Sequence, residues 1–180
     1  MELAECIKTR RSVRRYTDEM VDHDTIEKII DLARMSPSWK NTQTARYIIV
    51  EDEAKLAELA NKAVLGFEGN MKTISKSHQM LVLCSKAKRS GYERDGSFTT
   101  DKGISWEMFD AGIAAQTFSL AAHSMGVGSV MMGIFDENKV KEILDIPEDL
   151  NVSCLISFGY PKFEVEAVPR KEVSDLLSYQ

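Results

Sequence analysis

The chain has 180 residues, which is enough for one domain with a substantial hydrophobic core. Its net charge of −5 argues against a general nucleic-acid binder, whose surface would be basic overall. No apolar run reaches the roughly 20 residues that a membrane span needs, and the charged residues 1–8 do not resemble a signal peptide.

The three cysteines, Cys6, Cys84 and Cys154, are isolated from one another and form no CxxC pair. Such cysteines are typical of small buried side chains in a reducing compartment rather than of disulfides or metal sites. We therefore expect a cytoplasmic protein without a metal centre. No repeat, low-complexity tract or linker divides the sequence, so residues 1–180 are predicted to form a single domain.

The first part of the chain is predicted to be mainly helical. Residues 2–9 form a short amphipathic stretch that stops before a group of arginines. A capping box at 24–27 predicts the start of a second helix, whose apolar residues keep helical spacing, and Pro37 ends it. Alternating residues at 46–51 predict a strand, and residues 53–62 predict a surface helix.

The most hydrophobic element lies at 106–125, where apolar residues occupy nearly every helical face. A helix that is apolar all round is buried on all sides, at the centre of the fold or at a subunit interface. Before it come an apolar run at 80–84, which predicts a buried strand, and a polar segment at 90–103, which we expect to be a mobile loop. Gly126 ends the helix, and a strand follows at 128–132.

The C-terminal part adds one more helix and one more strand. Asp136 is predicted to cap the helix, and residues 152–158 are predicted to form the strand. Residues 160–180 have little core-forming pattern before a final short helix. They nevertheless carry apolar side chains, such as Phe163 and Val165, which are unfavourable in a tail surrounded by water. We expect this tail to lie across another surface, such as that of a partner subunit.

Two polar segments carry the functional prediction. Residues 10–16 hold four arginines beside the hydroxyl of Ser12, and guanidiniums packed so closely need an anion such as phosphate. Residues 36–43 contain two planar amides, Asn41 and Gln43, which suit the edge of a flat heteroaromatic ring. Alternatively, the first segment is a solvated basic turn. Together, the two segments indicate a nucleotide-like cofactor.

The usual catalytic constellations are missing from the sequence. It contains no Gly-x-Ser-x-Gly elbow and no Walker loop. The glycines at 126–128 follow a predicted helix and open a strand, which is the reverse of the dinucleotide fingerprint. The histidines have no metal-ligand spacing, and His123 is interpreted as an interior histidine with a hydrogen-bond partner. The chemistry is therefore expected to reside in a bound cofactor.

In their order and spacing, these features resemble the nitroreductase family of flavin mononucleotide (FMN) enzymes. The resemblance rests on the segments 10–16, 36–43, 106–128, 132–135, 159–161 and 169–171. It implies an α+β fold, an α/β sandwich in which a mixed, mainly antiparallel sheet of four to five strands is flanked by helices. It also implies a homodimer that forms along the long central helix, with the 160–180 tail packed on the partner and both flavins between the subunits.

The resemblance also implies a set of cofactor contacts. The FMN phosphate and ribityl chain fall on Arg10, Arg11, Ser12 and Arg14. The isoalloxazine ring falls on Pro37, Ser38, Trp39, Asn41 and Gln43. A backbone amide near flavin N5 falls on Met132 or Gly133, and Arg170 returns from the C-terminal tail to the phosphate. Asn70 and Lys72 are further candidates near the flavin.

The activity implied is transfer of hydride from NAD(P)H through flavin N5 to an oxidised acceptor such as a nitroaromatic or a quinone, in a ping-pong order. No side chain is then required as an acid, a base or a nucleophile. Two alternatives stay open: another flavin reaction on the same scaffold, such as reductive dehalogenation, and a non-catalytic FMN-binding redox protein. Neither nucleic acid nor a membrane is expected as a partner.

Overall fold

The computed structural model describes residues 1–180, with four strands and six α-helices. In chain order the elements are α1 (Leu3–Thr9), α2 (His23–Ala33), the 3₁₀ turn η1 (Trp39–Asn41), β1 (Ala45–Val50), α3 (Glu53–Lys62), α4 (Glu68–Ile74), β2 (Gln79–Lys86), α5 (Ser105–Ser124), β3 (Gly128–Met132), α6 (Glu137–Leu144), β4 (Leu150–Gly159) and the 3₁₀ turn η2 (Val173–Asp175).

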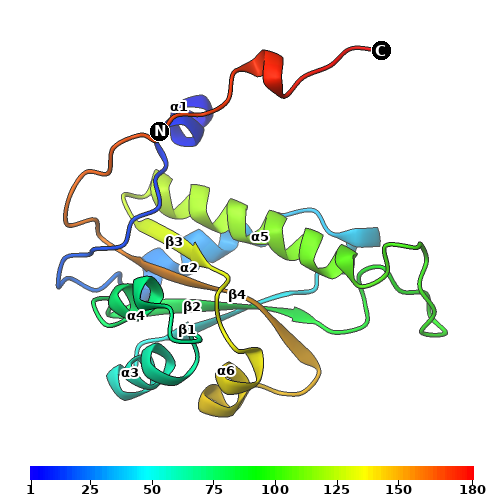
Figure 1. Ribbon diagram of the computed structural model, residues 1–180, viewed down its shortest axis with the longest axis horizontal. Coiled ribbons are helices and arrows are strands. Elements are labelled where there is room, and N and C mark those ends of the chain that lie inside the picture. The colour runs from blue at the N-terminus through cyan, green and yellow to red at the C-terminus, as the bar shows by residue number, and fades with distance from the viewer.

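The four strands form one sheet in the order β1-β2-β4-β3, and every neighbouring pair is antiparallel. Helices α2 and α5 cover one face, and α3, α4 and α6 cover the other (Figure 1). The predicted α+β fold, with four strands flanked by helices and a long helix against the sheet, is confirmed, although the sheet expected to be mixed is antiparallel between all four strands.

Each face of the sheet has its own hydrophobic core. Along β2, Leu81 and Leu83 belong to the core beneath α5, whereas Met80 and Val82 belong to the core beneath α3 and α6. This alternation follows from the two-residue period of a strand. The run at 80–84 is continuously apolar because both faces of β2 are covered by helices.

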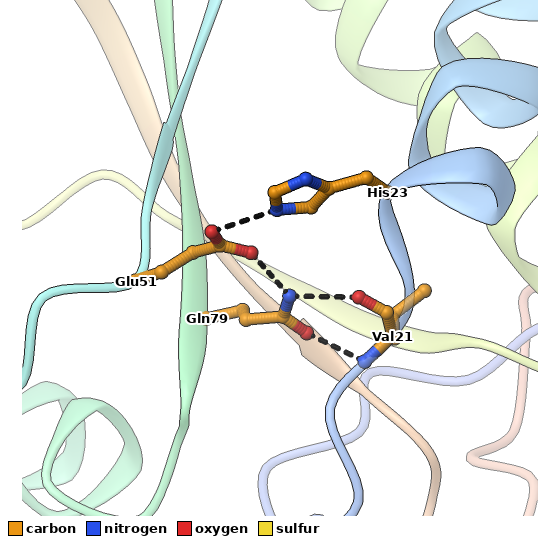
Figure 2. Close-up of polar contacts among 4 residues, drawn as sticks. All are labelled: Val21, His23, Glu51 and Gln79. Atoms are coloured by element: carbon orange, nitrogen blue, oxygen red, sulfur yellow. Dashed lines mark hydrogen bonds and ion pairs between the residues drawn. The ribbon is translucent and has the colours of Figure 1, made fainter.

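Helix α2 begins earlier than the capping box at 24–27 predicts. Its N-cap is Asp22, whose Oδ1 accepts a 2.8 Å hydrogen bond from the Thr25 amide. Position 22 is favoured because Val21 is fixed to the sheet by the side chain of Gln79, which accepts from the Val21 amide at 2.8 Å and donates to its carbonyl at 2.9 Å (Figure 2). The chain therefore enters the helix directly from this anchored residue.

The same glutamine connects to an ion pair at the surface. The Gln79 amide also donates to Glu51 Oε1 at 2.7 Å, and the other carboxylate oxygen of Glu51 lies 2.9 Å from His23 Nε2 (Figure 2). This network joins the start of α2 to the ends of β1 and β2.

The composition of α5 predicts a helix buried on all sides, at the centre of the fold or at a subunit interface. Within one chain, however, α5 is exposed on one side. It packs on the sheet through Ala111, Ala114, Ala115, Phe118 and Ala122. The opposite stripe is exposed, and its members are Met108, Phe109, Gly112 and Gln116. The apolar residues on this stripe have no cover from the chain itself.

The C-terminal tail leaves the body of the molecule (Figure 1). Its start is held by a bridge between Tyr16 and Pro161 and by a 3.0 Å hydrogen bond from the Lys162 amide to the Arg15 carbonyl. Every residue from Pro161 onward is exposed. No helix of the structure combines the length and apolarity that a membrane crossing requires, α5 included.

Candidate functional site

The arginine segment is fixed along the edge of β3. Ser12 forms a parallel bridge with Ser129, and the Val13 amide donates to the Ser129 carbonyl at 3.0 Å. The approach is close enough to require glycine at position 128, since a Cβ there would lie 2.6 Å from Val13 Cγ2. Buried Tyr16 then fixes the end of the segment, because its hydroxyl lies 2.6 Å from the Val13 carbonyl oxygen.

The arginines of this segment have no acidic partner in the chain. None of the ion pairs in the structure involves Arg10, Arg11 or Arg14. Arg11 donates through Nη1 to the carbonyls of Lys8 and Arg10, while its buried Nε has no hydrogen-bond partner. Such a group is costly unless it is paired, so the segment is suited to an added anion.

His123, at the end of α5, does not add to this positive charge. Its Nε2 lies 2.8 Å from the Thr9 hydroxyl, so the predicted hydrogen-bond partner is present, but the side chain is half-buried rather than interior. Burial, together with the nearby Arg10 and Arg11 charges, lowers the pKa of His123. The imidazole is therefore neutral near pH 7, and the arginines supply the charge.

The second polar segment, residues 36–43, forms a tight turn around η1. Lys40, Asn41 and Gln43 all have positive φ angles, of 43°, 55° and 49°. The side chains of Asn41 and Gln43 are exposed and make no hydrogen bond within the chain. The Ser38 hydroxyl accepts from the Gln43 amide at 2.9 Å and closes the turn. The turn thus presents free amides beside Pro37.

The structure does not bring the two polar segments together within one chain (Figure 1). Residues 10–16 lie near the end of α5, where Thr9 contacts His123. Residues 36–43 lie near its start, where the Trp39 amide donates to Asp110 Oδ2 at 2.9 Å. At roughly 1.5 Å per residue, Asp110 and His123 are about 20 Å apart along the helix. The two segments predicted to bind the cofactor, called half-sites below, thus lie apart within one chain.

The other predicted contacts are distributed between these places. Gly133 follows β3, about 13 Å along the strand direction from the Ser12–Ser129 bridge at about 3.3 Å per residue. Asn70 lies beside it, since its buried amide donates to the Ile134 carbonyl at 3.1 Å. Lys72 instead pairs with Glu68 on the outer surface of α4. Arg170 lies in the exposed tail, apart from the other arginines, and makes no hydrogen bond or ion pair.

Comparison with known proteins identifies the family. The model of the family described as "Nitroreductase family" matches residues 7–160. The chain belongs to the nitroreductase family. It is 31% identical to a putative NADH dehydrogenase/NAD(P)H nitroreductase of Archaeoglobus fulgidus, over 90% of this chain and 88% of the relative.

Solved structures of nitroreductase family members have the same fold. A nitroreductase family protein from Clostridium novyi NT is 31% identical with a TM-score of 0.78, covering 90% of this chain and 86% of its own. An FMN-dependent nitroreductase from Clostridium difficile R20291 is 28% identical with a TM-score of 0.74, covering 96% and 94%. The sequence resemblance to the family is thereby confirmed.

One buried polar residue of this nitroreductase family member has contacts that the sequence does not predict. Asp110 on α5 contacts the turn at Trp39 and also the hydroxyl of Ser90. A charged residue in a strongly apolar helix is the only trace that the sequence gives of this arrangement. Its partners lie far away along the chain, so its role emerges only from the fold.

Proposed function

We propose that this protein is an FMN-dependent oxidoreductase that oxidises NAD(P)H and reduces a small acceptor such as a nitroaromatic or a quinone. The observation that carries the proposal is the group of unpaired arginines beside Ser12, bound to the same strand that leads to Gly133. A phosphate at one end of β3 and a ring at the other match a flavin nucleotide. The nitroreductase name of the Archaeoglobus relative and the FMN dependence of the Clostridium difficile protein support it.

The residues present fit the proposed cofactor. The buried Nε of Arg11 and the free hydroxyl of Ser12 are donors without partners, and Arg10 and Arg14 supply further charge for a phosphate. Arg170 would join them from the tail. At the ring, the proposed contacts are Pro37, Ser38, Trp39, Asn41, Gln43 and the backbone of Met132 or Gly133.

The separation of the half-sites supports a homodimer. If two copies pack along α5 about a two-fold axis, the start of one α5 lies near the end of the other. Residues 36–43 of one copy would then meet Arg10 and Ser12 of its partner, which completes two equivalent sites. The exposed stripe that includes Met108 and Phe109 would form the interface, and the 160–180 tail would pack on the partner.

The mechanism assigns binding and electrostatic tasks to the chain. When bound, FMN would supply the hydride-transfer chemistry between NAD(P)H and the acceptor. The arginines hold the phosphate, and the amides of Asn41 and Gln43 orient the ring edge. Donors at that edge stabilise negative charge that develops there. Donor and acceptor would use one pocket in turn, in a ping-pong order.

A visible spectrum of the purified protein, after addition of FMN and removal of unbound flavin, tests this function. We expect flavin bands that bleach when NADH or NADPH is added without oxygen and return with a nitroaromatic or quinone. A protein that takes up no FMN would overturn the proposal. Bound flavin that NAD(P)H does not reduce would instead favour another flavin reaction or a non-catalytic redox protein.

Sedimentation of full-length protein tests the dimer. We expect twice the chain mass for the wild type and a monomer for Phe109→Asp, which places a charge in the exposed stripe. Leu65→Asp is the matched control, because this exposed apolar residue lies in the connection between α3 and α4, away from α5. A monomeric wild type that binds FMN would refute the two-chain site. The cytoplasmic location expected from the cysteines stays a prediction.

A further inference from the structure

The turn at 36–43 adopts a backbone conformation that must be held in place. Lys40, Asn41 and Gln43 lie in the left-handed region, which residues with a Cβ rarely adopt. Such conformations persist where the surroundings over-determine them, and they gather at functional sites. Contacts from other parts of the fold must therefore hold this turn in place.

A single buried carboxylate holds the turn at its start. Asp110 is 5% exposed, and its Oδ2 accepts from the Trp39 amide at 2.9 Å and from the Ser90 hydroxyl at 2.5 Å. Hydrogen bonds to an ionised acceptor are stronger than those between neutral groups. Ser90 is fully buried, and its oxygen lies 3.2 Å from the hydroxyl of Thr42. Asp110 therefore binds the residue that begins η1, and Ser90 contacts Thr42, the residue that follows it.

The same carboxylate connects the turn to a second loop. Ser90 begins the segment 90–103, which touches the turn again through a 2.9 Å ion pair between Glu93 and Lys40. Trp106, in the first turn of α5, packs against Trp39 with ring centroids 4.6 Å apart. The turn and the loop are therefore fixed to α5 as one unit.

Asp110 adjoins several of the residues proposed to contact the ring. It lines a cavity of about 240 Å³ together with Pro37, Ser38, Gln43 and Tyr47. Its hydrogen bonds run to the backbone of Trp39 and to Ser90, not to the free amides of Asn41 and Gln43. Any effect of Asp110 on a flavin would therefore act through the turn.

We propose that Asp110, acting with Ser90, is the positioning residue that sets residues 36–43 for binding the flavin ring. This inference rests on the proposed FMN-dependent function. It accounts for a buried carboxylate in an otherwise apolar helix, and for the strained turn that sits over it.

The test uses full-length protein carrying Asp110→Ala, Asp110→Asn or Ser90→Ala. The FMN dissociation constant is measured by quenching of flavin fluorescence, and the midpoint potential of the bound flavin is measured alongside it. Loss of a charge-assisted hydrogen bond predicts FMN binding about tenfold to a hundredfold weaker in Asp110→Ala. Asp110→Asn should lie between it and the wild type, because the amide keeps an acceptor but loses the charge.

The potential distinguishes positioning from a general loss of stability. If the turn no longer presents its amides, reduced flavin is less stabilised and the midpoint potential becomes more negative. Glu107→Gln is the matched control, since Glu107 is also a buried carboxylate of α5 but bonds to Asn151 instead. We expect its FMN affinity and flavin potential to equal those of the wild type.

The outcomes separate the two proposals. A wild type that binds no FMN overturns the function and this inference with it. A wild type that binds FMN, with a folded Asp110→Ala whose affinity and potential are unchanged, overturns only the inference. If Asp110→Ala does not fold, wild-type values in both Asp110→Asn and Ser90→Ala overturn it.

Discussion

Replacing Tyr16 by Phe removes a hydroxyl that fastens the arginine segment to the sheet. The Tyr16 oxygen lies 2.6 Å from the Val13 carbonyl oxygen and 2.9 Å from that of Ser157, on β4. The side chain is 5% exposed, and burial raises the pKa of the phenol, so it remains a donor at every pH of interest. The ring itself is retained in Tyr16→Phe, so packing changes little.

The expected cost follows from these contacts. One proton serves two buried carbonyls, and loss of a buried donor costs about 1–3 kcal/mol. For a protein of this size, that corresponds to a fall in Tm of roughly 3–8 °C. The Val13 carbonyl lies within the arginine segment, so FMN affinity should fall as well. Calorimetry of the apoprotein and flavin fluorescence titration measure the two effects.

Tyr47→Phe is the matched control, since the hydroxyl of Tyr47 is also buried but has no hydrogen-bond partner. We expect its Tm to equal that of the wild type. A Tyr16→Phe variant with the Tm and FMN affinity of the wild type would refute the reasoning that this hydroxyl fixes the segment.

Three further predictions follow from charged groups. Arg10→Ala should weaken FMN binding by about tenfold or more at low salt, whereas Arg15→Ala should not, because only Arg10 is proposed to contact the phosphate. Equal losses of affinity in a flavin fluorescence titration would contradict the assignment of Arg10 to the phosphate. Glu51 raises the pKa of His23, so the ion pair stabilises the fold below pH 6.5, and this stabilisation is lost as the pH rises through the raised pKa of His23. The urea midpoint of the wild type should therefore fall across this pH range, whereas that of His23→Gln should not show this fall. Burial raises the pKa of Glu107, so ionisation of this carboxyl destabilises the fold as the pH rises from 4.5 through the raised value. Glu107→Gln should therefore gain stability relative to the wild type as the pH rises above 4.5 in urea unfolding, and a difference that does not change with pH would refute this.

Local patterns determined much of the secondary structure. The helix at 53–62 and the strand at 128–132 have the predicted bounds, and Asp136 caps α6 as expected. The long helix and the β1 strand differ by one residue at each end. These elements depend on caps and on apolar periodicity, which are properties of neighbouring residues.

The sequence does not predict helix α4, because its seven residues are mostly polar and it is fixed by the packing of Ile74 and Met71 against the core. The start of α2 depended on Gln79, which lies 58 positions from Val21.

The sequence by itself predicts the residues of the candidate site, because clustered arginines need an anion wherever they fold and the remaining contacts follow from the resemblance to the family; these assignments stay predictions. Only the tertiary structure decided how those residues relate to one another. It placed residues 10–16 on β3 and residues 36–43 at the other end of α5, so that the two predicted cofactor-binding segments lie apart within one chain. It also gave Asp110 its partners, since the Trp39 amide lies 71 positions away along the chain. Hydrogen bonds between such distant residues depend on how the layers stack, and no local pattern specifies that.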